Sequence, residues 1–247
     1  MIALGDLTWP EAERLAAAGA LLAVPVGSTE QHGPHLPLST DTDVAVALAG
    51  RLAARRGDVV VAPPVGYGSS GEHAGFAGTI SIGQEAVELT LVELGRSAAE
   101  TFGHILFISA HGGNSEAATR AVVRLRAESR DVLLWIPGRT QGVTPGDGHA
   151  GRTETAIQLA LDPGRVRMGL AEPGNRTPIA ELMPVLRTGG VRAASRNGVL
   201  GDPAGASAAV GAALLEALTA DLLAAVAEWR RAAPANRTRS GRISAGG

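Results

Sequence analysis

The sequence predicts an α/β fold in which helices cover both faces of a mostly parallel β-sheet. Two observations support this fold class: apolar runs alternate with helical patterns along the chain, and each run is apolar throughout rather than at every second residue. The 247 residues can enclose a core, and no segment has the composition of an interdomain linker. We therefore expect one domain over residues 1–232. Residues 233–247 have little to bury and are expected to be a disordered tail.

The predicted strands are continuous apolar runs that contain β-branched residues. They cover residues 21–26, 59–62, 105–109 and 132–136. Their length and continuity are typical of strands that are buried on both faces, as in a parallel sheet.

Helical patterns lie between the predicted strands and after the last of them. They cover residues 8–18, 41–56, 84–102 and 114–130. Thr8 and Glu11 have the spacing of a capping box, and Asn114 is a good N-cap for the fourth pattern. Beyond Pro137 the chain is rich in loops, with a short helix at 151–161 and a long one at 204–231. The long helix repeats apolar residues every four positions, at Leu214, Leu218, Leu222 and Val226.

The charge balance argues against two classes of partner. A net charge of −2 gives no basic surface for nucleic acid or for an anionic membrane. The start of the chain lacks the pattern of a secretory signal, and no apolar run of membrane-spanning length is apparent. We expect a cytoplasmic protein with a small or neutral partner.

Two residue types are missing, and their absence limits the chemistry. The chain has no cysteine, and every basic residue is arginine. Disulfides, thiolate ligands, a cysteine nucleophile and lysine chemistry are therefore excluded. Any metal must bind to His, Asp and Glu, a ligand set that suits zinc, manganese or ferrous iron.

Five of the six histidines fall in glycine-rich loops beside predicted strands or helices: His32, His35, His73, His111 and His149. A single loop histidine is usually a solvated turn residue. Five together favour a site, because α/β sheets bind ligands beyond the carboxyl ends of their strands.

Three segments offer metal ligands at these loops. Glu30 and His32 are two residues apart, so they point to the same side if the chain is extended. Asp41 follows where the next helix begins, and His111 comes directly after a strand. A third segment offers His149 in its loop and Glu154 just inside a helix. These side chains suffice for two metal ions, bridged by a carboxylate.

Four motifs in matching order resemble the creatininase family of metal-dependent amidohydrolases: GSTEQHGPHLPLSTDTD, GYGSSGEHAGFAGTISIG, SAHGGN and GHAGRTETA. The match extends over nearly the whole chain. The resemblance implies a three-layer α/β/α sandwich, a homo-oligomer that is usually a hexamer, and two divalent metal ions in the site.

The same resemblance implies a role for each ligand. Glu30 and His111 would bind one ion, His32 would bind the other, and Asp41 would bridge both. His149 would act on the substrate or the leaving group, and a histidine suits the acid that protonates a departing amine.

One position departs from the family pattern. Creatininase has a Glu two residues after the histidine that matches His111, whereas this chain has Gly113. We expect Glu154 to supply the missing ligand of the second ion, and a structural role in its helix is the alternative.

Three segments resemble one branch of the family, peptidases that cut a small modified precursor peptide, and they extend the match through the C-terminal half. The segments are GSSGEH, GNRTPIAELMPVLRTGGV and NGVLGDPAGASAAVG. The resemblance implies that a radical-SAM enzyme first decarboxylates and cross-links the peptide's C-terminal Val-Tyr, and that the peptidase cuts the amide before the modified Val. The alternative substrate is another small amide, such as creatinine, a related cyclic amide or a formamide.

Other candidates have a plainer interpretation beside the functional one. Glu72 and His73 would contact the substrate, or else lie exposed in a turn. His35 and Asp43 would orient ligands, or else hydrogen-bond within the turn.

The segment GYGSSG, residues 66–71, matches the G-x-G-x-x-G pattern of dinucleotide-binding loops. That function requires a helix to open at the third glycine, and the residues that follow have no helical period. Dinucleotide binding is therefore a remote alternative.

Overall fold

The computed structural model describes residues 1–138 and 147–232. Its centre is a sheet of five parallel strands in the order β1-β3-β2-β4-β5. The strands are β1 (Ile2–Ala3), β2 (Leu21–Val26), β3 (Val59–Val61), β4 (His104–Ser109) and β5 (Val132–Trp135). The four predicted strands are confirmed to within one residue at each end, and only the two-residue β1 was not predicted. The expected tail, residues 233–247, lies outside the described residues.

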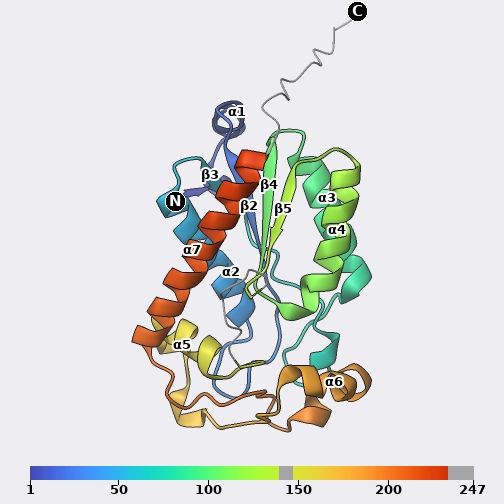
Figure 1. Ribbon diagram of the computed structural model, residues 1–247, viewed down its shortest axis with the longest axis vertical. Helices are drawn as coiled ribbons and strands as arrows, with labels where there is room; N and C mark the ends of the chain where they lie inside the picture. The colour runs from blue at the N-terminus through green and yellow to red at the C-terminus, as the bar shows by residue number, and fades with distance from the viewer. Residues whose placement is uncertain (139–146, 233–247) are drawn as a thin grey trace, which may run out of the picture.

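Seven α-helices surround the sheet within the described residues. They are α1 (Trp9–Ala17), α2 (Thr40–Arg55), α3 (Gly83–Ala98), α4 (Ser115–Ala127), α5 (Arg152–Leu161), α6 (Ile179–Ala194) and α7 (Ala208–Ala232). Figure 1 shows α3 and α4 on one side of the strands and α2, α5 and α7 on the other. The predicted three-layer α/β/α sandwich is confirmed.

Alternate residues of the central strand face the two helical layers. Leu22 and Val24 belong to a core cluster with residues of α3 and α4, whereas Leu21 and Ala23 pack with α2, α5 and α7. Successive side chains of a strand point to opposite faces, so a strand that is buried on both faces must be apolar throughout. The continuous apolar run of β2 is thus the result of its central position.

The long helix α7 covers one face of the sheet. By length and composition it alone, among the described helices, could cross a membrane. Its buried residues Leu215, Leu218, Leu222 and Val226 pack into the same core cluster as β2 and α2, so α7 has the place of a core helix.

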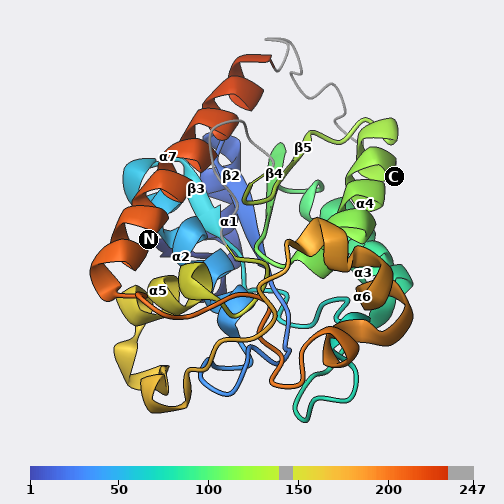
Figure 2. The same ribbon diagram turned by 60° about the horizontal axis from the view of Figure 1, so that its bottom comes forward.

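Helix α6 was not predicted, because Pro184 and two adjacent glycines interrupt its helical pattern. Gly190 has a φ of 68°, which divides the helix at a kink. Figures 1 and 2 show α6 with the loops beyond the end of the sheet. There it packs on the short 3₁₀ turn Gly71–His73, so it supports a loop that carries a candidate site residue.

Two caps were predicted, and one of them is wrong. The Glu11 carboxylate accepts a hydrogen bond from the Thr8 backbone N–H at 2.7 Å, as expected for the start of α1. Asn114 precedes α4, but its side chain does not cap the helix. Instead it accepts from the Ser69 N–H and donates to the Gly27 carbonyl, both at 2.9 Å. Asn114 therefore ties two site loops together.

Asp131, just before β5, connects α7 to the sheet at the end opposite the site loops. It accepts hydrogen bonds from Trp229 Nε1 at 2.7 Å and from His104 Nδ1 at 2.8 Å. Burial opposes the charged form, but these two donors outweigh it and lower the pKa of Asp131. The ionised carboxylate therefore stabilises the fold.

Asp131→Asn is expected to reduce the free energy of unfolding at pH 7 by about 1–2 kcal/mol, because charge-assisted hydrogen bonds are lost. A lowered folded-state pKa stabilises the protein fully above the unfolded value of about 4, and this stabilisation is lost as the pH falls through the folded value. Urea denaturation at pH 7 and at pH 3 measures both effects. Glu216→Gln, in an exposed ion pair with Arg55, is the control and should change little. A loss that is equal at both pH values would contradict the role of the charge.

Candidate metal centre

The site forms where the two central strands end. Val26 of β2 is in register with Ser109 of β4, so the residues that follow each strand emerge side by side. Glu30 and His32 follow β2, and His111 follows β4. This is the carboxyl end of the sheet, as the sequence predicted.

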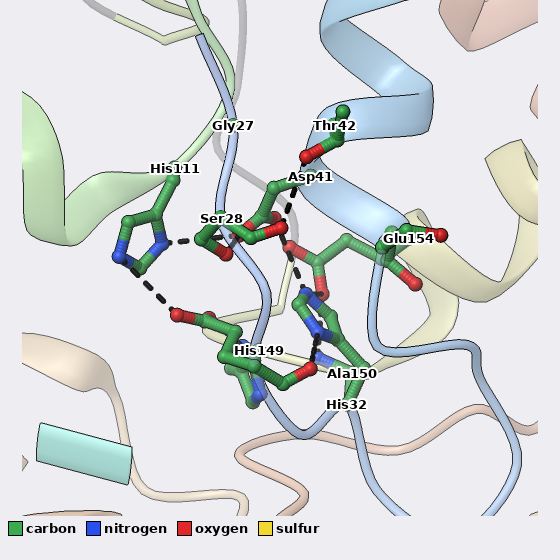
Figure 3. A network of polar contacts seen from close by, with 12 residues as sticks. Gly27, Ser28, His32, Asp41, Thr42, His111, His149, Ala150 and Glu154 are labelled. Carbon is green, nitrogen blue, oxygen red and sulfur yellow. Dashed lines mark hydrogen bonds and ion pairs between the residues drawn. The ribbon is translucent and has the colours of Figure 1, made fainter. Parts of the chain in front are cut away.

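Helix α2 brings Asp41 to the same place. A Cβ at Gly27 would lie 2.4 Å from Thr42 Cα, so only glycine allows β2 and α2 to approach this closely. The Thr42 hydroxyl donates to the Ser28 carbonyl at 2.9 Å, and the Ser28 hydroxyl donates to Asp41 Oδ2 at 2.6 Å. The helix start is thus fixed to the strand end, and the Asp41 carboxylate is fixed with it (Figure 3).

Asp41 lies between two imidazoles, with one oxygen toward each. His111 Nδ1 is 3.1 Å from Asp41 Oδ2, and His32 Nε2 is 3.2 Å from Asp41 Oδ1. Figure 3 shows both rings turned toward this carboxylate. A carboxylate in this position can bridge two cations.

Two groups of potential ligand atoms share Asp41. The first contains Glu30, Asp41 and His111, and the second contains His32, Asp41 and Glu154; in each group the ligand atoms lie within 4.8 Å of one another. His111 Nε2 is 3.2 Å from Glu30 Oε2, and His32 Nε2 is 3.9 Å from Glu154 Oε2. These residues are the ligands that the sequence predicts, and a third group of Glu30, His32 and His149 also meets the distance limit, so the division of ligands between two ions stays a prediction.

Glu154 has both a structural contact in the loop before α5 and a position among the candidate metal ligands. Its Oε2 accepts a hydrogen bond from the Ala150 N–H at 2.6 Å, which fixes the loop before α5. The same carboxylate faces His32 and Asp41. A side chain at Gly113 could not replace it, because a Cβ there would lie 2.3 Å from the Ser69 carbonyl oxygen and 2.7 Å from Glu72 Oε1.

The electrostatics fit a bound cation. Burial raises the pKa of Glu30 to about 7, and the nearby Asp41 adds to the rise. Burial lowers the pKa of His32 and His111, but the neighbouring carboxylates outweigh it and raise both pKa values to about 10. A divalent cation can take the place of these added protons, and within the described residues the buried Glu30 Oε2 accepts no hydrogen bond. The donors are the N and O atoms that zinc, manganese and ferrous iron accept.

His149 and His73 complete the cluster around Glu30. His149 Nδ1 is 3.9 Å and His73 Nε2 is 3.3 Å from Glu30 Oε1, and their ring centroids are 4.5 Å apart. His73 is buried, so the alternative of an exposed turn residue is wrong for it, and its contact with the substrate stays a prediction. Glu72 is half-buried beside Gly113, at the edge of the cluster.

Gln31 was not predicted, although it lies between two candidate ligands. Its Nε2 is 2.9 Å from His73 Nδ1, 3.1 Å from His149 Nε2 and 3.1 Å from the Gly198 carbonyl oxygen. Strict alternation would turn it away from Glu30 and His32, but all three side chains are buried. Its sequence position beside the ligands was the available signal.

His35 and Asp43 lie outside the cluster. His35 Nε2 is 2.8 Å from the Thr155 hydroxyl, and Thr155 adjoins Glu154 on α5. Asp43 instead accepts from Arg165 at 2.7 Å.

The segment 66–71 is followed by a 3₁₀ turn and not by an α-helix, so the dinucleotide-binding alternative is wrong.

Comparisons with known proteins show what the chain is similar to. The sequence profile of the creatininase family, described as creatinine amidohydrolase, matches residues 5–226. The chain is 53% identical over 196 residues to the mycofactocin precursor peptide peptidase of Mycolicibacterium smegmatis, covering 77% of this chain and 78% of that protein. It is 46% identical over 235 residues to the protein of the same name from Mycobacterium tuberculosis, covering 92% of both. It is also 30% identical over 212 residues to creatinine amidohydrolase from Pseudomonas putida, covering 74% of this chain and 81% of that protein.

Solved structures share the fold. A mutant creatininase of the Zn–Zn type superposes with a TM-score of 0.78 at 26% identity, covering 92% of this chain and 97% of the other. A manganese form of creatininase gives a TM-score of 0.77 at 26% identity, covering 92% and 98%.

Asp41→Ala is expected to weaken binding of divalent metal by at least about tenfold, because both ligand groups lose a member. The measurement is metal content per chain by mass spectrometry after dialysis, with circular dichroism to check the fold. Asp43→Ala is the matched control, since Asp43 lies in the same helical turn but pairs with Arg165. Full metal content in Asp41→Ala would show that this carboxylate holds no ion.

Proposed function

The chain belongs to the creatininase family and is a metal-dependent hydrolase of C–N bonds, and from this premise we propose that it cleaves the mycofactocin precursor peptide. The substrate is the precursor with a modified C-terminal Val-Tyr, and the bond that is cut is the amide before the modified Val. The similarity to peptidases of that name covers 92% of the chain, which supports a peptide rather than a small cyclic amide.

The observation that carries the proposal is the shared position of Asp41 between two ligand groups, in which every member except the half-buried Glu154 is buried. Glu30 and His111 would hold one divalent ion, His32 and Glu154 the other, and Asp41 both. Structures of relatives in Zn–Zn and manganese forms support zinc or manganese, and the donor set also suits ferrous iron. Bound there, the ions supply Lewis-acid activation of the amide carbonyl and of the attacking water.

His149 is positioned to carry a proton between water and leaving group. Its Nε2 lies 2.8 Å from the Gln31 carbonyl oxygen, to which it donates, so Nδ1 keeps its lone pair and faces Glu30. Burial, the largest cause, holds the pKa of His149 well below its ordinary value. The imidazole is therefore neutral at first. It accepts a proton at Nδ1 from the attacking water and transfers that proton to the departing amine nitrogen.

Gln31 fixes the tautomers of both histidines. Its amide nitrogen donates to His73 Nδ1 and to the Gly198 carbonyl, and its backbone carbonyl accepts from His149 Nε2. His73 then carries its proton on Nε2, which faces Glu30 Oε1 at 3.3 Å. His73 thus holds the Glu30 carboxylate, and His149 remains free to accept a proton.

We also propose that the protein is cytoplasmic. We propose further that it assembles into a homo-oligomer, and the resemblance to the family implies a hexamer. Large apolar side chains on the outer helices support a contact between subunits: Trp9 is 77% exposed, Val123 64% and Leu89 56%.

The test is digestion of the modified precursor peptide followed by mass spectrometry of the products. Purified protein is expected to release the modified dipeptide, to lose this activity on treatment with a chelator, and to regain it with zinc, manganese or ferrous iron. Creatinine is the comparison substrate. Turnover of creatinine with an untouched peptide would overturn the substrate assignment.

His149→Gln is expected to lower kcat by about 100- to 10,000-fold, the range for a positioned proton carrier, and to retain bound metal. Gln31→Leu should lower kcat by about tenfold or more with little change in KM, because the tautomer of His73 is no longer fixed and its hold on the Glu30 carboxylate is lost. His104→Gln is the control, since His104 lies away from the site beside Asp131. Unchanged kcat in His149→Gln would remove its catalytic role.

A further inference from the structure

A cavity of about 430 Å³ adjoins the metal centre but is not part of it. Its lining includes Gln31, Leu38, Phe76, Glu172, Arg192 and Arg196. Gln31 is the connection, because its side chain also contacts His73 and His149. Only the side chain of Gln31 therefore separates a ligand in this cavity from His149, the proposed proton carrier.

The segment that follows α6 is held against the site. The Gly198 carbonyl accepts from Gln31 Nε2 at 3.1 Å. Gly198 has a φ of 80°, and a Cβ there would lie 2.0 Å from Gln31 Oε1, so a side chain cannot be accommodated. Arg196 lies two residues before this contact, and its place near the site is thus set by the backbone.

Arg192 is oriented before any ligand binds. Its Nη1 donates to the Gly75 carbonyl, and its guanidinium lies over the Phe76 ring, 5.2 Å from the centroid. A guanidinium has five N–H donors, so most of those on Arg192 remain available. The Arg192 guanidinium is therefore held in place by these two contacts, with N–H donors still free for a ligand.

Arg196 and Glu172 have no ion pair or side-chain hydrogen bond within residues 1–138 and 147–232. The cavity thus contains two guanidinium groups and a single carboxylate that neutralises neither through a direct contact. Its charge is positive, and apolar side chains of Leu38 and Phe76 complete the wall. Such a cavity favours a carboxylate on a partly apolar ligand, because a guanidinium binds a carboxylate through two parallel hydrogen bonds.

We propose that this cavity is a subsite for the peptide substrate, in which Arg192 and Arg196 bind a carboxylate close in sequence to the amide that is cut. The inference rests on the proposed function, since it takes the substrate to be a peptide. The C-terminal carboxylate is lost when the Val-Tyr is decarboxylated, so an acidic side chain of the peptide is the source of this group. A small cyclic amide would occupy the metal centre without reaching the cavity, so the subsite selects peptides over small amides.

The test is a binding measurement that does not need turnover. Fluorescein-labelled precursor peptide is titrated into metal-loaded His149→Gln protein, and Kd is read from fluorescence anisotropy. Adding Arg196→Gln is expected to raise Kd by about tenfold or more, the loss of a charge-assisted hydrogen bond. Arg192→Gln should act in the same direction. Arg187→Gln is the matched control, an exposed arginine on the same helix but outside the cavity lining, and should leave Kd unchanged.

One altered peptide tests the source of the carboxylate, with every Asp and Glu replaced by Asn and Gln. This peptide is expected to bind with a raised Kd and to show no further loss on adding Arg196→Gln. An unchanged Kd for this peptide would overturn the binding of an acidic side chain by the two arginines. Equal Kd values for the parent protein and both arginine variants would overturn the subsite.

Failure of the subsite and failure of the function have different signatures. If the active protein cleaves the precursor while Arg196→Gln leaves both Kd and KM unchanged, the subsite is wrong and the function stands. If the active protein leaves the peptide uncut while Arg196→Gln still weakens peptide binding, the function is wrong and the subsite stands.

Discussion

The position of the Asp41 carboxylate between His32 and His111 is the constraint on which the site depends. Its two oxygens contact one imidazole each, at 3.2 and 3.1 Å. This requires the start of α2 to lie directly against the ends of two neighbouring strands. Gly27 permits the approach because it has no Cβ, and the Ser28 and Thr42 hydroxyls fix it with hydrogen bonds. A parallel sheet supplies the rest, since its strands end at one edge and deliver their loops to one place.

Burying so many ionisable groups is unfavourable unless their charges are compensated. The raised pKa values of His32 and His111 indicate how strongly the carboxylates here attract positive charge. A divalent ion satisfies the same demand, and this links metal binding to the stability of the loops. The absence of a side chain at Gly113 fits this arrangement, because the Ser69 carbonyl and Glu72 fill the space where a creatininase-type Glu would begin. Glu154 approaches from α5 instead, so the ligand set is completed from another element of the fold.

Sequence patterns identified the fold class, the four main strands and the candidate ligands. The reason is that each depends on local chemistry: apolar runs mark strands buried on both faces, and clustered Glu, His and Asp residues in Gly-rich loops have few structural uses. The ordered motifs also identified the family. By contrast, the sequence did not predict α6, because Pro184 and Gly190 break its helical pattern. Contacts with the turn Gly71–His73 stabilise this helix in the folded protein. Local propensity does not include such contacts.

The sequence by itself determined which residues could bind metal and which strands would carry them. Only the tertiary structure decided how they divide into two groups around Asp41, that His73 is buried beside Glu30, and that Asn114 links Gly27 to Ser69 instead of capping α4. The contacts of Gln31 likewise exist only in the folded protein, where His73, His149 and Gly198 lie around its side chain. The physical reason is distance along the chain: hydrogen bonds and charge pairs act over a few ångströms in space, and a sequence pattern records only which residues are neighbours along the backbone.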